Sequence, residues 1–258
     1  MTSKDILQRV FPLYSINKEL MEYFQLQLVL GCDEVNAYLD KRKFSKEILD
    51  LFRIGYCPDA QTVYDFVLSR GWSEQSLQDN GFWSILDDNS IIVKFENRLM
   101  FPFSDVDGTV YGFSGRVLHD DKISNKYVNT SNCIVYNKGL IVYGFREALL
   151  LNKNNIDRWI LVEGNADVLS MFQAGFTTTV ACAGTAITEH HIRLLSRYSK
   201  DFVLLLDNDD AGKKATIRVS EIIGNLHLNW QIASLEGTKD VDEAIREGKT
   251  HLIQQSLG

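Results

Sequence analysis

The sequence of 258 residues has few of the features that mark secreted, membrane-bound or metal-stapled proteins. No apolar run approaches the length that spans a bilayer, and the first residues lack the basic-then-apolar layout of a signal peptide. The scattered cysteines form no CxxC pair and no Cys/His cluster: Cys32, Cys57, Cys133 and Cys182. We therefore expect neither zinc nor a membrane partner, and a reducing, cytoplasmic location.

Motifs that bind phosphate or nucleic acid are also sparse. The P-loop pattern GxxxxGK[ST] does not occur, and Gly112 and Gly115 are spaced wrongly for a dinucleotide fingerprint. The net charge of −7 disfavours a nucleic-acid partner for the molecule as a whole. Residues 122–146, however, include four basic side chains and neither Asp nor Glu, so one stretch is locally positive.

The first part of the chain mixes helix and strand signals. Residues 33–52 are typical of two short helices with Asp33 and Ser45 as N-caps. From 91 to 118, β-branched and aromatic residues are interrupted by Asp107-Gly108, which predicts strands joined by a tight turn.

The second part alternates between apolar strands and amphipathic helices. The expected strands are 158–163, 177–183, 201–207 and 228–235, and the expected helices are 166–176, 188–199 and 211–224. Gly175 closes the first of these helices and Thr188 caps the second. This order predicts a parallel sheet with helices on its faces.

Carboxylates are crowded where one of these strands ends. The stretch LLLDNDDAGKKA (204–215) puts Asp207, Asp209 and Asp210 into four positions after a run of leucines. Like charges this close repel, so a positive partner is expected among them. A solvated turn with an N-cap is the simpler alternative. A calcium-binding EF-hand loop is disfavoured, because Ala211 and Arg218 stand where such a loop needs oxygen ligands.

More distant carboxylates join the same edge of the predicted sheet. Glu163 ends the first strand and Asp207 the third, and ligands of open α/β sheets bind beyond the carboxyl ends of the strands. Asp167 faces this edge from the next helix, while Asp240 and Asp242 follow the fourth strand. Clustered carboxylates are hard oxygen ligands that suit Mg²⁺ or Mn²⁺. By contrast, the adjacent His190 and His191 point different ways and favour a capping or surface role.

Three blocks of the sequence carry a family resemblance. VEGNADVLSMFQAGF, TVACAGTAITEHHIRLL and FVLLLDNDDAGKKA together resemble a TOPRIM domain. NRLMFPFSDVDGTVYGFSGRVL, followed by NKYVNTSNCIVYNKGLIVYGFREAL, is similar to the RNA-polymerase core of bacterial (DnaG-type) primases, and YLDKRKFSKEILDLFRIGYCPD resembles the helical segment before it. The resemblance runs from about Val35 to Asp242 in the family's order.

The resemblance implies an α/β protein with an N-terminal mixed α+β subdomain (1–150) and a TOPRIM subdomain with a Rossmann-like parallel sheet (151–258). The implied function is DNA primase activity, the metal-dependent, template-directed synthesis of short RNA primers on single-stranded DNA during replication. Implied partners are the DNA template, ribonucleoside triphosphates, and a replicative helicase or a separate zinc-bearing protein. The implied location is the cytoplasm of a bacterium or of a phage-infected host.

The family's functional positions carry over onto two groups of residues. The resemblance implies two or more Mg²⁺ or Mn²⁺ ions at Glu163, Asp167, Asp207, Asp209, Asp240 and Asp242, of which Glu163, Asp207 and Asp209 are catalytic. It implies nucleotide or template binding by Arg98, Arg116, Lys126, Asn129 and Lys138.

The sequence departs from the family at several places. Family members carry an aromatic residue and Met where Asn165 and Ala166 stand, and a basic residue where Asp210 stands. The family's zinc-binding and helicase-binding domains have no counterpart here, which leaves an excised core or a compact, phage-encoded protein as alternatives. Two other functions stay open: a TOPRIM-type metal-dependent nuclease and a non-catalytic nucleic-acid-binding scaffold.

Overall fold

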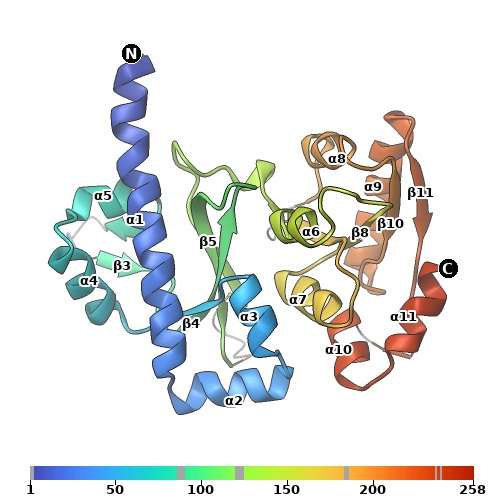
Figure 1. Ribbon diagram of the computed structural model, residues 1–258, viewed down its shortest axis with the longest axis horizontal. Helices are drawn as coiled ribbons and strands as arrows, with labels where there is room; N and C mark the ends of the chain where they lie inside the picture. The colour runs from blue at the N-terminus through green and yellow to red at the C-terminus, as the bar shows by residue number, and fades with distance from the viewer. Residues whose placement is uncertain (1–2, 86–90, 120–124, 183–185, 236, 239) are drawn as a thin grey trace. The chain divides into compact units, whose positions relative to one another are not determined.

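The computed structural model describes residues 3–85, 91–119, 125–182, 186–235, 237–238 and 240–258. The chain divides into two compact units (Figure 1). Unit 1 comprises residues 1–41 and 49–138, and unit 2 comprises residues 42–48 and 139–258. The predicted subdomain division after residue 150 stays a prediction.

Helix α1 (Ser3–Leu30) is the long blue helix of Figure 1. Its buried residues Leu13, Ile16, Leu20 and Phe24 recur every three or four positions, which puts them on one face of the helix. The next helices are α2 (Asp33–Arg42), α3 (Lys46–Leu51), α4 (Ala60–Ser69) and α5 (Glu74–Asp79). Ser45 caps α3 as predicted, since its hydroxyl accepts a hydrogen bond from the Ile48 amide at 3.4 Å. Asp33 instead is the first residue of α2, one position inside the predicted boundary.

The sheet of unit 1 is antiparallel and has the strand order β1-β4-β5-β6. Its strands are β1 (Gly55–Cys57), β4 (Arg98–Ser104), β5 (Val110–Val117) and β6 (Tyr127–Asn129), and β2 (Trp83–Ile85) pairs separately with β3 (Ile91–Val93). The predicted Asp107-Gly108 turn is confirmed: it joins β4 to β5, with Gly108 at φ +93°. Phe24 and Val63 lie in the core of this unit, together with Phe82, Phe95 and Phe113.

Unit 2 is built on a five-stranded sheet with the order β11-β10-β8-β9-β7. The strands are β7 (Val142–Tyr143), β8 (Trp159–Val162), β9 (Thr179–Cys182), β10 (Asp201–Leu204) and β11 (Asn229–Ile232). The four predicted strands are confirmed as parallel neighbours. Strand β7 was not among the four strands predicted for this sheet, and it pairs with β9 in the antiparallel direction. Only two residues long, it is too short to give a periodic signal.

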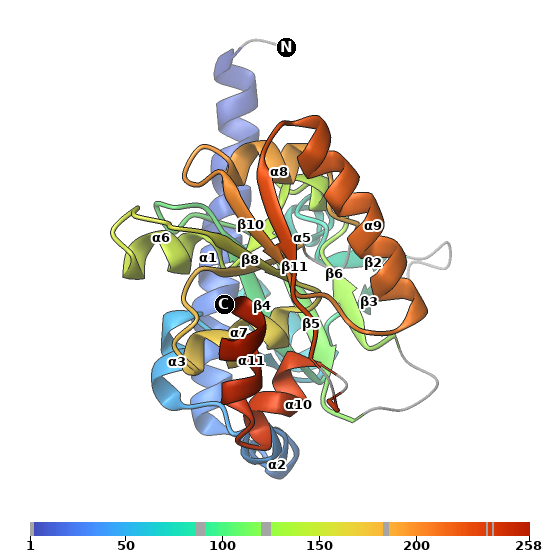
Figure 2. The ribbon, with the colours of Figure 1, turned by 90° about the vertical axis from the view of Figure 1, so that its right-hand side faces the viewer.

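The helices of unit 2 follow the strands closely. They are the 3₁₀ turn η1 (Lys138–Leu140), which begins on the last residue of unit 1, and α6 (Phe145–Leu151), α7 (Asn165–Gln173), α8 (Glu189–Leu195), α9 (Asp210–Asn225), α10 (Val241–Arg246) and α11 (Thr250–Leu257). Helix α10 packs against α7 and α11, and α8 packs against α9 (Figure 2). Thr188 caps α8 as predicted, and His191 completes its capping box. No helix among the described residues is both long and apolar enough to cross a membrane.

Candidate active site

The carboxyl ends of β8 and β10 bring Glu163 and Asp207 together. Glu163 Oε1 accepts a hydrogen bond from the Asp207 amide at 3.2 Å. The first turn of α9 approaches both residues so closely that a Cβ at Gly212 would lie 2.1 Å from the Asp207 carbonyl oxygen and 2.8 Å from Glu163 Oε1. Only glycine fits at that position, and its presence lets α9 begin directly against the carboxylates.

Three further carboxylates hold the first turns of helices. Asp209 Oδ1 caps α9 by accepting from the Gly212 amide at 2.8 Å, and Asp240 Oδ1 caps α10 by accepting from the Glu243 amide at 2.8 Å. In α7, Asp167 Oδ2 accepts from the Gly164 amide at 3.0 Å. Within the described part of the chain, the second oxygen of each of these carboxylates has no protein hydrogen-bond donor. Capping therefore fixes the side chains and leaves one oxygen of each for a ligand.

The carboxylates also influence one another electrostatically. Burial raises the pKa of Asp167 to about 8, and the charges of Asp240, Asp207 and Asp242 add to the rise. Partial burial raises the pKa of Glu163 too, with a further contribution from Asp209. Asp207 therefore acts on Asp167, and Asp209 acts on Glu163, so the carboxylates of this edge are coupled electrostatically. The edge carries more negative charge than the surrounding protein compensates.

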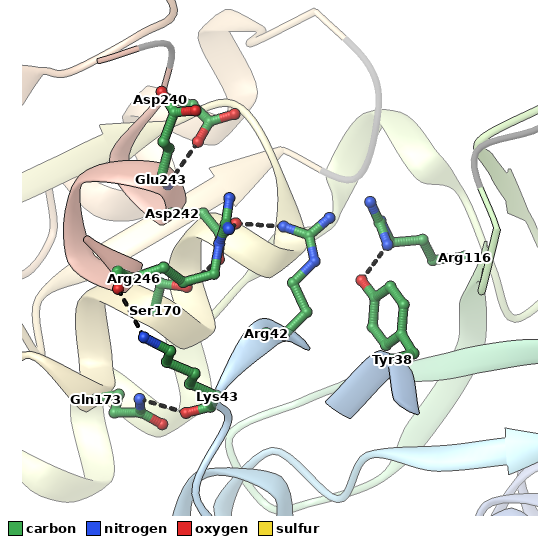
Figure 3. Close-up of polar contacts among 10 residues, drawn as sticks. All are labelled: Tyr38, Arg42, Lys43, Arg116, Ser170, Gln173, Asp240, Asp242, Glu243 and Arg246. Atoms are coloured by element: carbon green, nitrogen blue, oxygen red, sulfur yellow. Dashed lines mark hydrogen bonds and ion pairs between the residues drawn. The ribbon is translucent and has the colours of Figure 1, made fainter. Parts of the chain in front are cut away.

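Asp242 differs from the other carboxylates because protein donors surround it (Figure 3). Only 2% of its side-chain surface is exposed. Oδ1 accepts from Ser170 Oγ at 2.7 Å, while Oδ2 accepts from Arg246 Nε at 2.9 Å and from Arg42 Nη1. Sequence reasoning missed these three partners. The i,i+4 spacing of Asp242 and Arg246 was a usable signal, whereas nothing in the sequence links Asp242 to Arg42.

Divalent cations fit the chemistry of this edge, although the protein alone does not form a closed cage. In the described ranges, no three His, Cys, Asp or Glu side chains are arranged to hold a metal ion. Their oxygens are nevertheless hard donors, and their mutual repulsion calls for positive charge. Asp207 and Asp240 both line a hollow of about 10 Å³, comparable to the space one water molecule occupies. A cation at such an edge keeps several of its water ligands.

The predicted nucleotide- and template-binding residues lie in unit 1 and differ in exposure. Arg116 is 1% exposed; its guanidinium lies 4.9 Å from the ring centroid of Tyr38 and 5.7 Å from that of Tyr127, and it donates to the Tyr38 hydroxyl. Arg98 is also buried and donates to the Asn125 carbonyl at 2.9 Å.

The other three predicted binding residues are closer to solvent. Asn129 is half-buried in β6, and Lys126 and Lys138 are exposed. Lys126 and Lys138 are thus accessible to phosphate groups of a ligand, whereas Arg98 and Arg116 are buried and form hydrogen bonds within the protein.

The residues that depart from the family pattern have separate environments. Asn165 and Ala166 are buried in the first turn of α7. Asp210 is exposed in the first turn of α9, next to Asp209. Asp210 therefore adds one more negative charge beside Asp209. An acidic residue in the first turn also stabilises a helix, because it interacts favourably with the helix dipole.

The parallel sheet with carboxylates at its carboxyl edge assigns unit 2 to the Toprim-like class. Comparison with known proteins assigns both parts of the chain to families. Residues 23–149 match the family described as DNA primase catalytic core, N-terminal domain, and residues 160–245 match the family described as Toprim-like. The DNA primase of Borreliella burgdorferi is 33% identical over 95% of this chain and 46% of its own length.

Solved structures agree with this assignment. The Escherichia coli primase catalytic core is 31% identical, with a TM-score of 0.83 over 95% of this chain and 79% of that one. A DnaG primase catalytic domain bound to single-stranded DNA is also 31% identical, with a TM-score of 0.83 over 97% of this chain and 83% of that one. The chain belongs to the family of DnaG-type DNA primase catalytic cores. It spans less than half the length of the curated relatives it matches.

Proposed function

We propose that this protein synthesises short RNA primers on single-stranded DNA from ribonucleoside triphosphates. The observation that carries this proposal is the group of carboxylates at the carboxyl edge of the unit 2 sheet, in a chain of the primase-core family. Primer synthesis needs positive charge beside a reacting phosphate, and carboxylate oxygens are the ligands that a divalent cation supplying this charge would need.

We assign the cation-binding role to Glu163, Asp167, Asp207, Asp209 and Asp240, with Glu163, Asp207 and Asp209 in the catalytic position. Two or more Mg²⁺ or Mn²⁺ ions there would stabilise the charge that develops on the transferring phosphoryl group. The protein's own contribution is to orient the oxygens. The caps of α9 and α10 and the Asp207–Glu163 hydrogen bond fix three of the five carboxylates before any ligand arrives.

The basic residues of unit 1 divide into two roles. Lys126 and Lys138 are exposed, so we assign them direct contacts with the triphosphate or the template backbone. Arg98 and Arg116 support the same surface from inside, since Arg116 contacts Tyr127 of β6 and Arg98 holds the residue before Lys126. Asn129 is the last residue of β6. Because the protein is acidic overall, binding to single-stranded DNA should be weak and should fall as salt rises.

A synthesis assay with a parallel cleavage assay tests the proposal. Purified protein is incubated with single-stranded DNA, labelled ribonucleotides and Mg²⁺ or Mn²⁺, and the RNA products are sequenced. We expect RNA complementary to the template and no product without a divalent cation. Cleaved DNA without synthesis would identify a TOPRIM-type nuclease, and DNA binding without either reaction would identify a scaffold. We also propose that the protein acts in the cytoplasm together with a replicative helicase or a separate zinc-bearing protein.

A further inference from the structure

Four side chains form a cluster around α10, of which Ser170 and Asp242 are buried and Arg42 and Arg246 are half-buried. We call Arg42, Ser170, Asp242 and Arg246 the Asp242 cluster (Figure 3). Its members come from the end of α2, from α7 and from α10 itself, and all four belong to unit 2. The cluster therefore links a segment from early in the chain to one from near its C-terminal end.

Further contacts attach the same early segment to unit 2. Lys43 Nζ donates to the Arg246 carbonyl at 3.0 Å, and Gln173 Nε2 donates to the Lys43 carbonyl at 2.8 Å. Gln173 Oε1 accepts from the Ser45 amide at 2.7 Å. Residues 42–45 thus bridge α7 and α10, and the Asp242 cluster is the charged centre of this bridge.

The hydrogen bonding of Asp242 resembles that of a structural ion pair more than that of a metal ligand. Three donors occupy its two oxygens, and two of the donors are guanidinium groups. A buried carboxylate with this many partners already has its charge compensated. Asp240 lies two residues earlier, is half-buried, and has one oxygen without a protein donor in the described region. The two neighbouring carboxylates therefore have different environments and different capacities for a cation.

We propose that Asp242 is a positioning residue, which Arg42 and Arg246 hold in place so that α10 presents Asp240 to the cation. Asp242 itself does not bind the ion. This inference rests on the proposed cation-binding function of the edge. Of the six predicted metal ligands, five would then contact the ion. The sixth, Asp242, would orient helix α10, at whose start Asp240 lies.

Mn²⁺ binding by wild-type protein and three variants tests this division, with calorimetry for affinity and electron paramagnetic resonance for the number of bound ions. Asp242→Asn and Arg42→Gln should each weaken Mn²⁺ binding by about tenfold, as loss of a group behind a metal ligand commonly does, with the number of bound ions unchanged. The double variant Arg42→Gln/Asp242→Asn should bind more tightly than Asp242→Asn. In the double variant only Arg246, and not Arg42, is left as a half-buried guanidinium without its carboxylate.

An exposed ion pair near the end of α10 supplies matched controls for the change in charge. Glu247 Oε2 and Lys249 Nζ are 2.6 Å apart, so Glu247→Gln and Lys249→Gln each remove one charge, of opposite sign, without removing a hydrogen bond of the Asp242 cluster. Both should bind Mn²⁺ like the wild type.

Three outcomes would overturn the inference while leaving the proposed function intact. Loss of one bound ion in Asp242→Asn, with no recovery in the double variant, would make Asp242 a ligand. Tighter Mn²⁺ binding by Arg42→Gln would mean that Arg42 competes with the cation. Wild-type affinity in both single variants would mean that the cluster does not position the site. Absence of Mn²⁺ binding in the wild type would instead contradict the proposed function itself.

Discussion

Acid should destabilise unit 2 through one histidine. His191 is fully buried at the start of α8, and its Nδ1 accepts from the Thr188 amide at 3.1 Å. Protonation would place a hydrogen on that nitrogen, so it would break the capping box and charge a buried ring. Burial, together with the nearby His190, accordingly lowers the pKa of His191 from 6.5 to about 4.

The direction and size of the effect follow from this pKa. Because the folded state binds the proton more weakly than the unfolded chain, the stabilising contribution is complete above pH 6.5 and is lost as the pH falls toward 4. A difference between 6.5 and about 4 corresponds to a loss of up to about 3 kcal/mol of unfolding free energy. His191→Gln removes the titration and keeps a residue that capping boxes favour at this position.

Urea unfolding between pH 4.5 and 7.5 measures the effect, followed by tryptophan fluorescence, to which Trp159, buried in unit 2, contributes. The wild type should lose more stability on acidification than His191→Gln, by up to about 1.4 kcal/mol per pH unit. His190→Gln, which removes the exposed neighbouring ring, should keep most of the wild-type dependence. Identical acid dependence in the wild type and His191→Gln would refute this account of the buried ring.

Substitutions at three positions test the site. Asp209→Asn should keep the α9 cap but abolish synthesis, whereas Asp209→Ala should also cost about 1 kcal/mol of stability in thermal unfolding. Lys126→Ala should weaken the apparent affinity for nucleotide or template by about 1–3 kcal/mol in a steady-state titration and leave the fold unchanged; an unaltered affinity would remove it from the site. Gly212→Ala should lower both stability and Mn²⁺ affinity, because its Cβ would collide with the Asp207 carbonyl; wild-type behaviour in both would contradict that geometry.

Much of unit 2 was predictable from the sequence because its signals are local. Apolar strands, Thr188 as a cap and Gly175 as a helix end each act within a few residues, and the structure places all of them as expected. The convergence of Glu163 and Asp207 was also predictable, since parallel strands present their carboxyl ends on one edge. Pattern and topology were sufficient for this part of the site.

The Asp242 cluster and the burial of Arg116 could not be predicted in the same way. Arg42 and Asp242 lie 200 positions apart, and no periodicity relates them. Arg116 has the same sequence signal as an exposed phosphate-binding arginine, and only the packing of Tyr38 and Tyr127 shows that it is enclosed. Such contacts depend on tertiary packing, which short-range patterns do not encode.

The rate of dinucleotide synthesis by the wild type and Asp207→Asn tests the central claim most directly. Both proteins are assayed on single-stranded DNA with Mn²⁺, after circular dichroism has established that they are equally folded. Our account predicts template-dependent synthesis by the wild type and none by Asp207→Asn, because the substitution removes one of the negative charges that a cation at this edge would compensate. Equal synthesis by the two proteins would contradict the claim that this edge holds the catalytic cations.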